Sequence, residues 1–341
     1  MGVKITELMH PKTIEFSDLH NKILVVDAFN MLYQFITTIR QPDGSPLTDN
    51  SGNITSHLAG LFYRITNLMK LGMKLVFVFD GKSHVLKFKE QERRAKIKSE
   101  AKKLYDEAVE AEDIEEMKKY ASRTAKLTTE MIQESKELLD ALGIPVIQAP
   151  GEGEAQAAYM VKNGDAFAVV SQDADSLLFG AERIVKNLSI SKKRKKTGKL
   201  GYDKVLPELI KYKDVLETLG IDEEQLIILG ILVGTDFNIG GIKGIGPKKA
   251  MKLVKEKKGK WNELFQEASW DFSYDWKEVY EIFNQPDITK EYTLSWKDVN
   301  EEKVSKIMIT DHNFSQERVG SVLKELLSIK EKEQKGLSDF F

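Results

Sequence analysis

Short apolar runs that end at or just before an acidic residue recur along the chain and alternate with segments of helical periodicity. Residues 22–27 (KILVVD) and 74–80 (KLVFVFD) are two such runs, and residues 166–171 (AFAVVS) stop just before Asp173. Runs of this length and composition are typical of strands buried in a parallel sheet. Apolar residues recur at helical spacing between them, as in residues 55–71. The alternation predicts an α/β fold with a central, mainly parallel sheet flanked by helices.

The segment from residue 82 to residue 142 has a different pattern. It contains no Gly or Pro and is rich in Lys, Glu, Ala, Leu and Met, which are good helix formers. Its first half has few apolar anchors, which predicts a helix that projects into solvent or touches a charged partner. An amphipathic helix is expected from Leu127 to the glycine at position 143, and residues 144–148 (IPVIQ) predict a short strand after it.

The C-terminal half contains one strongly apolar helix and one glycine-rich turn. Residues 225–233 (QLIILGILV) predict a buried helix that leads into Gly234, Thr235 and Asp236. Residues 239–250 (IGGIKGIGPKKA) predict a turn that opens another helix, with Pro247 at its first position. Three further segments are a Lys-rich hairpin or loop at 184–200, a helix at 315–330 and a polar tail at 330–341.

Composition excludes several classes of protein. The chain has 341 residues, of which 41% are hydrophobic and 30% charged, as expected of a soluble globular protein with a large core. It has no cysteine, which excludes a disulfide framework and a Cys-based zinc site. No apolar run approaches the roughly 20 residues that span a bilayer, and no signal peptide is visible.

Charge is distributed in blocks, although the net charge is only −2. Residues 82–103 hold nine Lys or Arg and three Glu, which gives a local net charge of +6. Residues 106–116 hold seven acids and no base, and residues 192–199 hold six basic residues and no acid. Such blocks predict a polarised surface that binds a charged partner.

Seven carboxylates stand at or just beyond the ends of apolar runs. They are Asp27, Asp80, Glu152, Glu154, Asp173, Asp175 and Asp236. The carboxyl ends of strands in an open α/β sheet face one edge, so we expect these side chains to converge there. Converging carboxylates need a cation, whereas either acidic pair alone would be explained as helix-capping residues. Oxygen ligands without a His cluster favour Mg²⁺ or Mn²⁺ over zinc, and two ions about 4 Å apart suit phosphodiester hydrolysis.

Other features suit a nucleic-acid ligand. In the glycine-rich turn, Gly244 and Gly246 let backbone N–H groups approach a phosphate beside Lys248 and Lys249, while an ordinary Gly-Pro turn is the alternative. This contact would grip a DNA backbone without reading sequence, and the absence of a Gly-Lys-Ser/Thr sequence argues against a nucleotide P-loop.

Lys87 and Arg94 are seven residues apart and therefore share one face of the projecting helix. From there Lys87 can reach a phosphate at the carboxylates, while a solvated basic face is the alternative. Tyr33 can stack on a base or belong to the core. At the C-terminus, Phe340 and Phe341 end a polar tail, which predicts docking in a partner's apolar pocket or on the protein's own core.

These motifs together resemble the flap structure-specific endonucleases of the 5′-nuclease superfamily, in their archaeal form, over nearly the whole chain. The motifs that carry the resemblance are Asp27 with Asn30 and Tyr33, Ser56-His57-Leu58 with Phe62-Tyr63-Arg64, and residues 78–82, 149–157, 171–175, 234–237 and 241–250.

The resemblance implies a PIN-like 5′-nuclease fold with a projecting helical arch or cap and a helix–three-turn–helix motif. It implies that the seven acids hold two Mg²⁺, which Mn²⁺ can replace, that Asp173 is catalytic, and that Lys87 and Arg94 contact the scissile phosphate. It further implies that Tyr33 stacks near the displaced base and that Arg64 lies where the family holds a one-nucleotide 3′ flap. The turn would bind downstream duplex, often with K⁺.

The implied activity is cleavage at the base of 5′ DNA flaps with 5′–3′ exonuclease activity, in Okazaki fragment maturation and long-patch base excision repair. The tail matches a sliding-clamp (PCNA) motif through Gln334, Leu337, Phe340 and Phe341. A monomer apart from the clamp is expected, cytoplasmic and associated with the nucleoid, without a membrane partner. A non-catalytic junction binder or clamp adaptor, or another nuclease of the superfamily, is the alternative.

The expected organisation is a single nuclease domain over residues 1–330 followed by a flexible clamp-binding tail at 331–341. Within the domain we expect an N-terminal nuclease region at about 1–105, an arch or cap at about 82–142 and an internal nuclease region at about 143–240. The helix–three-turn–helix is expected at about 225–260.

Overall fold

A seven-stranded sheet forms the centre of the computed structural model, which describes residues 8–111, 113–188, 193–195 and 202–338. The strand order is β1–β9–β6–β5–β2–β3–β4. The strands are β1 (Lys12–Thr13), β2 (Ile23–Asp27), β3 (Lys74–Phe79), β4 (Val146–Gln148), β5 (Ala168–Val170), β6 (Arg183–Lys186) and β9 (Glu208–Lys211). The five strands from β6 to β4 are parallel, whereas β9 and β1 pair antiparallel. The predicted mainly parallel sheet is confirmed.

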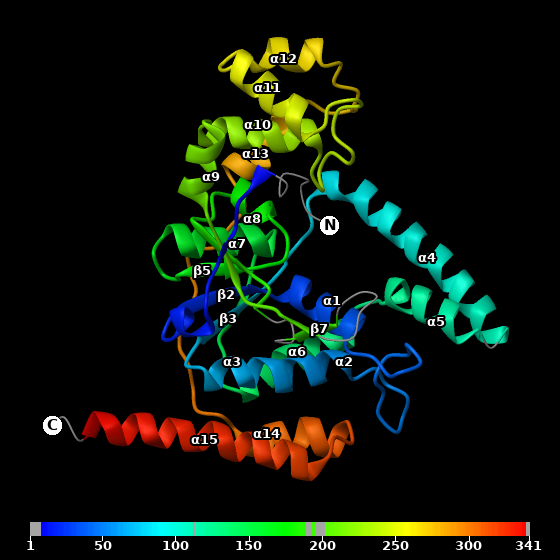
Figure 1. Cartoon of the computed structure of the whole chain (residues 1–341), viewed down its shortest axis with the longest axis vertical. Coiled ribbons are helices and arrows are strands. Elements are labelled where there is room, and N and C mark those ends of the chain that lie inside the picture. Colours follow the sequence, from blue (N-terminus) through cyan, green and yellow to red (C-terminus); the bar gives the residue numbers. More distant parts are fainter. Residues whose placement is uncertain (1–7, 112, 189–192, 196–201, 339–341) are drawn as a thin grey trace.

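Helices cover both faces of this sheet (Figure 1). Side chains alternate along a strand, so Leu24 and Val26 of β2 enter one core and Val25 enters the other. The core around Val25 is closed by α7 (Gly153–Lys162), α8 (Asp175–Leu178) and α10 (Glu223–Val233). The opposite core is closed by α1 (Ala28–Thr38), α3 (Thr66–Lys70) and α6 (Thr129–Ala141). Burial on both faces explains why the strands are apolar throughout.

The helix predicted over residues 55–71 is divided in the structure. It consists of α2 (Ser56–Ala59), a π-helical segment (Gly60–Ile65) and α3. Gly60 lies against Phe35 of α1, where an added Cβ would stand 2.2 Å from the ring. The segment remains helical overall, and its apolar face is buried as its periodicity predicts.

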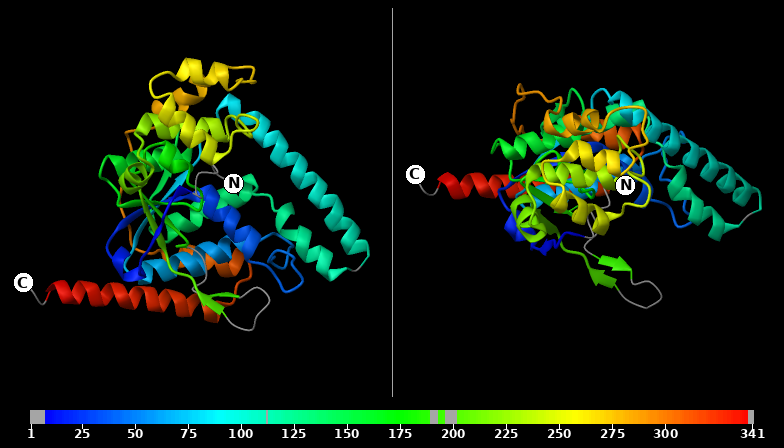
Figure 2. Two further views of the ribbon diagram at one scale, coloured as in Figure 1. Left: turned by 45° about the horizontal axis from the view of Figure 1, so that its top comes forward. Right: turned by 90° about the horizontal axis from the view of Figure 1, so that it is seen from above.

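Two helices project from the body and form an arch (Figures 1 and 2). They are α4 (Phe88–Glu110) and α5 (Ile114–Ala121), and the chain enters α4 through a 3₁₀ turn (Val85–Lys87). The chain returns to the sheet through α6, which begins at Thr129 with Thr128 as its N-cap. This arrangement confirms the projecting helical segment that the charge-rich sequence predicts.

The glycine-rich turn and three short helices form one end of the molecule, at the top of Figure 1. After α9 (Tyr212–Leu219) and α10, the chain continues through α11 (Pro247–Glu256), α12 (Trp261–Glu267) and α13 (Trp276–Asn284). Residues 285–300 then run back without regular structure. Buried Gln156 of α7 binds this segment by donating to the Thr289 carbonyl at 2.9 Å and accepting from its N–H at 2.8 Å.

The C-terminal helices pack beneath the sheet, and the last one is longer than predicted. They are α14 (Glu301–Ser305), a π-helical segment (Lys306–Asp311) and α15 (Gln316–Ser338). The backbone stays helical beyond Lys330, where a polar tail was predicted, because Lys, Glu and Gln are good helix formers. Gln334 and Leu337 therefore lie within α15, while Phe340 and Phe341 lie outside the described residues.

In the Lys-rich segment, β7 (Lys193–Lys195) pairs antiparallel with β8 (Tyr202–Lys204). The hairpin stands away from the body (Figure 2), which agrees with the hairpin alternative of the sequence. No helix in the described part of the chain is long and apolar enough to cross a membrane.

Candidate active site

Two of the seven carboxylates are placed by strands β2 and β3. Asp27 closes β2 and caps α1, where its Oδ1 accepts from the Asn30 N–H at 3.0 Å. Asp80 follows β3, and its Oδ1 accepts from the Gly153 N–H at 2.7 Å, at the start of α7. An added Cβ on Gly153 would lie 2.6 Å from that oxygen, so the contact requires glycine.

Five further carboxylates follow β4, β5 and α10. Glu152 is the N-cap residue of α7 and Glu154 lies in its first turn, while Asp173 follows β5 and Asp175 begins α8. Asp236 lies in the turn after α10. Buried Asn238 fixes this turn, since it accepts from the Thr235 N–H at 3.1 Å and hydroxyl at 2.7 Å and donates to the Ile231 carbonyl at 2.7 Å.

The seven carboxylates form one electrostatic cluster. Burial and the nearby Asp80 and Asp173 raise the pKa of Asp27 to about 7, although the Asn30 N–H opposes them. Burial and Glu152 raise the pKa of Asp80, to which Asp236 also contributes. Burial and then Asp175, Asp27 and Asp173 raise the pKa of Glu154. The strand ends thus converge as the sequence predicts, and the cluster has an excess of negative charge.

Lys87 and Arg94 reach this cluster from the base of the arch. The Lys87 ammonium contacts Glu152 and lies 3.7 Å from Asp236. Burial would lower the pKa of Lys87, but these acids and Asp80 outweigh burial and raise it. Arg94 donates to both oxygens of Asp236 at 2.8 and 2.9 Å and to Glu90 at 2.5 Å. Both cations therefore touch the carboxylates directly.

The donor set suits a hard divalent cation. Among the described residues, no three Asp, Glu or His side chains are grouped closely enough to hold an ion as they stand. Two of the carboxylates, Glu152 and Asp236, are engaged by Lys87 and Arg94. The remaining chemistry fits, since the oxygens are carboxylate oxygens. Burial first, and neighbouring carboxylates second, raise the pKa values of Asp27, Asp80 and Glu154, although Lys87 opposes them, and a bound cation would offset both effects.

Tyr33 lies half-buried on α1, facing the arch. The Lys98 ammonium lies 4.7 Å from the centre of its ring and 3.3 Å from its hydroxyl. Lys98 is four residues beyond Arg94 and so continues the face that carries Lys87 and Arg94. Lys98 was not anticipated from the sequence, although this spacing was the available signal.

Glu90 was not anticipated from the sequence, and Asn30 was noted there only as part of a motif, without a role of its own. Glu90 is buried and binds Arg93 and Arg94, which lower its pKa although burial opposes them. Its spacing of three and four residues from the two arginines was the signal. Asn30 donates from Nδ2 to Asp173 Oδ2 at 2.9 Å, a long-range contact that no local spacing indicates.

Arg64 lines a cavity of about 490 Å³. The walls come from the loop after α1, the π-helical segment and residues 312–318. Arg64 lies over the Phe35 ring, 5.5 Å from its centre, and burial lowers its pKa. Arg318, His312 and Thr55 are among the polar residues that share the cavity.

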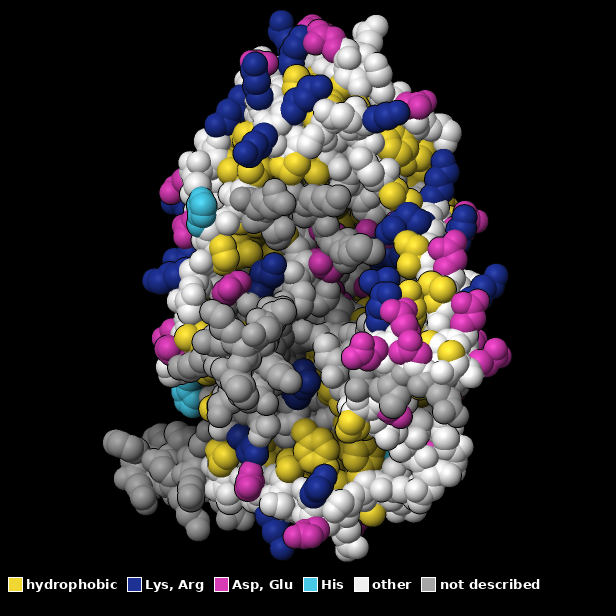
Figure 3. Space-filling view, turned by 45° about the vertical axis from the view of Figure 1, so that its right-hand side comes forward, with side chains coloured by type: hydrophobic (Ala, Val, Ile, Leu, Met, Phe, Trp, Pro, Cys, Tyr) yellow, Lys and Arg dark blue, Asp and Glu magenta, His cyan; other side chains and the backbone are white. Residues whose placement is uncertain are grey.

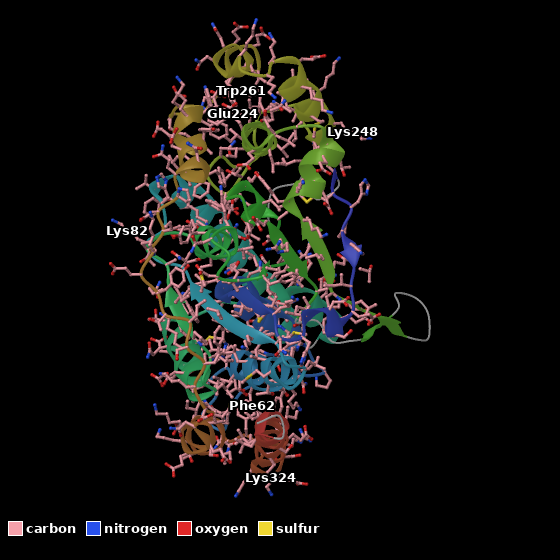
Figure 4. The ribbon with its side chains drawn as sticks, turned by 90° about the vertical axis from the view of Figure 1, so that its left-hand side faces the viewer. Phe62, Lys82, Glu224, Lys248, Trp261 and Lys324 are labelled. Atoms are coloured by element: carbon pink, nitrogen blue, oxygen red, sulfur yellow. The ribbon has the colours of Figure 1, made fainter. Side chains whose placement is uncertain are left out.

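The glycine-rich turn has the geometry that its sequence predicts. Gly244 has a φ of +79°, Gly246 caps α11 and Pro247 occupies the first turn of that helix. Lys248 and Lys249 are exposed at the helix start, and Figure 4 shows Lys248 pointing outward. Figure 3 shows Lys and Arg side chains gathered at the top of the molecule, where Figure 1 places α11 and α12.

Comparison with known proteins agrees with this arrangement. The family models described as the XPG N-terminal domain and the XPG I-region match residues 1–101 and 143–236. Flap endonuclease 1 of Hyperthermus butylicus is 50% identical over 329 residues, which cover 96% of this chain and 94% of the relative.

Two solved structures extend the comparison. The flap endonuclease-1 structure from Methanococcus jannaschii superposes with a TM-score of 0.77 at 39% identity, covering 97% of this chain and all of that one. The catalytic core of Rad2 in complex with a DNA substrate shares the fold, with a TM-score of 0.65 at 24% identity, over 95% of this chain and 99% of that one. The carboxylate cluster, the arch and these similarities lead to one conclusion: the chain belongs to the flap endonuclease family.

Proposed function

We propose that this protein is a structure-specific endonuclease that hydrolyses DNA at the base of 5′ flaps, with 5′–3′ exonuclease activity on recessed ends. The observation that carries the proposal is the meeting of seven carboxylates with Lys87 and Arg94 at one edge of the sheet. Members of this family generally use divalent metal ions. An acidic cluster that two arch cations can reach supports cation-assisted hydrolysis of a phosphodiester.

The seven acids would hold two Mg²⁺, with Mn²⁺ as a possible substitute, and Asp173 would be essential among them. Bound there, the ions would activate water and stabilise the leaving oxygen. Lys87 and Arg94 would turn from Glu152 and Asp236 to the oxygens of the scissile phosphate. Their charges would then stabilise the negative charge that develops during hydrolysis.

Three surfaces would select the substrate. Gly244, Gly246, Lys248 and Lys249 would bind the phosphates of the downstream duplex, with K⁺ as an additional ligand of the turn. Tyr33 would stack on the base beside the scissile bond once Lys98 leaves its ring. The cavity that contains Arg64 would hold a single nucleotide of a 3′ flap, because its volume is comparable with that of a small-ligand site.

The arch would distinguish a free 5′ end from a closed loop of DNA. Helices α4 and α5 project together, and Lys87 and Arg94 reach the carboxylates from the base of this arch. A single strand with a free end could pass beneath them, which supports a threading enzyme over a bubble-cutting one. Such an activity fits Okazaki fragment maturation and long-patch base excision repair.

The partner would be a sliding clamp, bound through Gln334, Leu337, Phe340 and Phe341. The motif supports this proposal, and the helical backbone of Gln334 and Leu337 would have to adapt to the clamp or unwind. The enzyme would act as a monomer apart from the clamp, on chromosomal DNA in the cytoplasm.

A panel of end-labelled DNA substrates tests the proposal. The wild-type protein is incubated with a 5′ flap, a gapped duplex and a bubble of equal length, in Mg²⁺ and in EDTA. Cleavage at the flap base that requires Mg²⁺ and is strongest on the flap supports it. Binding of the flap without cleavage would instead establish a junction binder, and preferred cleavage of the bubble would establish a different nuclease.

A further inference from the structure

Asn30 connects two of the carboxylates that the proposed function assigns to metal ions. It lies in the first turn of α1, three residues after Asp27. Its backbone N–H donates to Asp27 Oδ1 at 3.0 Å, and its side-chain Nδ2 donates to Asp173 Oδ2 at 2.9 Å. Its Oδ1 accepts from the Gln172 N–H at 3.3 Å. Asn30 therefore contacts one acid at the end of β2 and one acid that follows β5, and the second contact joins positions 143 residues apart.

The contact between Asn30 and Asp173 lies at the topological switch point of the sheet, where the strand order changes from one side of β2 to the other. Strand β2 lies between β3 and β5, so the chain builds outward on one side through β3 and β4 and then crosses to β5. The ladder between β2 and β5 has its last pair at Val26 and Val170. Beyond that pair one strand enters α1 and the other enters the loop that carries Asp173. Asn30 spans the crevice that opens between them, which is where ligands of such sheets bind.

The side chain of Asn30 is fixed by the two bonds that it makes. Its Oδ1 takes the Gln172 N–H, so its amino group must be the end that faces Asp173. An amide is a neutral donor, so it orients a carboxylate without supplying the positive charge that a cation would bring. A lysine here would compete with a cation for the same oxygens, and an apolar residue would leave Asp173 without this bond.

We propose that Asn30 is a positioning residue for the divalent-cation site: it holds the Asp173 carboxylate in register with Asp27 across the β2–β5 crevice. The inference rests on the proposed function, because it concerns the cations that this function requires. Residues that orient metal ligands typically change metal affinity or activity by about 10- to 100-fold when replaced. We therefore expect Asn30 to set the affinity for metal more than the fold or the binding of DNA.

The test measures metal binding directly. Asn30→Ala removes both side-chain bonds, and Asn30→Leu removes them while keeping most of the side-chain volume. Mn²⁺ binding to the DNA-free protein is followed by electron paramagnetic resonance, and Tm is measured in EDTA. Thr38→Ala, at an exposed position of the same helix, is the control. The Mg²⁺ dependence of flap cleavage is measured on the same proteins.

We expect both Asn30 variants to weaken Mn²⁺ binding about 10-fold or more and to raise the Mg²⁺ concentration for half-maximal cleavage by a similar factor. The control should bind Mn²⁺ like the wild type. A lower Tm with unchanged Mn²⁺ affinity in Asn30→Leu would overturn the inference and leave Asn30 a structural residue. Wild-type protein that binds no Mn²⁺ would overturn the proposed function as well, so the two failures are distinguishable.

Discussion

Arg94 in the arch helix donates two hydrogen bonds, at 2.8 and 2.9 Å, to Asp236, a carboxylate that follows α10. The two residues are 142 positions apart, and the contact ties the base of α4 to the acidic cluster. Arg94 also binds Glu90 one turn earlier, so its guanidinium is held on two sides. The same guanidinium is thus an anchor of the arch and a candidate ligand of the scissile phosphate.

Arg94→Ala should loosen the arch in the DNA-free protein. Charge-assisted hydrogen bonds are among the stronger ones. Because the Arg94 side chain is partly exposed, we expect its removal to lower the free energy of local opening of α4 by only roughly 1 kcal/mol. Hydrogen exchange of α4 amides near residue 94 should therefore be several-fold faster than in the wild type. Lys96→Ala, at an exposed position of the same helix, is the control. Unchanged exchange in Arg94→Ala would show that the Asp236 contact does not restrain the arch.

Lys87→Ala should lower the turnover of flap cleavage by about 100-fold or more while changing DNA affinity little. The reason is that Lys87 contacts Glu152 inside the cluster, where, in the proposed function, its charge would act on the reacting phosphate and not on the duplex. Single-turnover cleavage and fluorescence-anisotropy binding separate the two effects. Exposed Lys89→Ala is the matched control. A loss of affinity with normal turnover would remove Lys87 from the active site.

Replacing Phe340 and Phe341 with Ala should abolish stimulation by the sliding clamp and leave basal flap cleavage intact. Two aromatic side chains at the end of a polar segment supply the apolar area that a partner pocket needs. Cleavage rates with and without clamp give the result. Replacement of exposed Lys324 and Glu325 of α15 by Ala is the control. Full stimulation of the Phe variant would place the docking site elsewhere.

His57 makes the stability of the fold depend on pH. Its side chain is buried, its Nε2 is 2.9 Å from Glu134 Oε2, and its Nδ1 has no hydrogen-bond partner within the described structure. Glu134 also faces His312, which in turn contacts Asp49. Burial lowers the pKa of His57, although Glu134 opposes it. The unfolded chain therefore binds a proton near pH 6.5 that the native state does not bind.

As a result, the stability contributed by neutral His57 is fully present above about pH 6.5. As the pH falls below that value, the free energy of unfolding decreases by at most about 1.4 kcal/mol per pH unit. Urea unfolding of His57→Gln should show a shallower decline from pH 7 to pH 5 than unfolding of the wild type. Exposed His10→Gln should decline like the wild type. Parallel curves for His57→Gln and wild type would contradict the assignment.

The strands, the convergence of the acids and the start of α11 were predictable because each depends on local pattern. KILVVD and KLVFVFD each contain an apolar run with an acid at its end, and parallel strands bring such ends to one edge. Pro247 after Gly246 fixes the start of a helix by backbone chemistry alone. The strands and the helix start follow from local sequence alone, and the convergence of the acids needs only the added rule that parallel strands end at one edge.

Contacts between distant segments were not predictable from such patterns. The bonds of Asn30 to Asp173, of Arg94 to Asp236 and of Gln156 to Thr289 join positions more than 130 residues apart. The final turns of α15 were missed because charged residues suit both a solvated helix and a tail. Lys98 was missed because a basic helix face gives no sign of which ring it will cover.

Cleavage of a 5′ flap by Asp173→Ala tests the central claim most directly. Asp214→Ala, an exposed acid on α9, is the control, and flap binding is measured on both proteins. We expect Asp173→Ala to lose at least about 1,000-fold in single-turnover cleavage in saturating Mg²⁺ while it binds the flap with nearly wild-type affinity. In the proposed function this acid would hold a metal ion and would not bind the DNA backbone. Undiminished cleavage by Asp173→Ala would contradict the account.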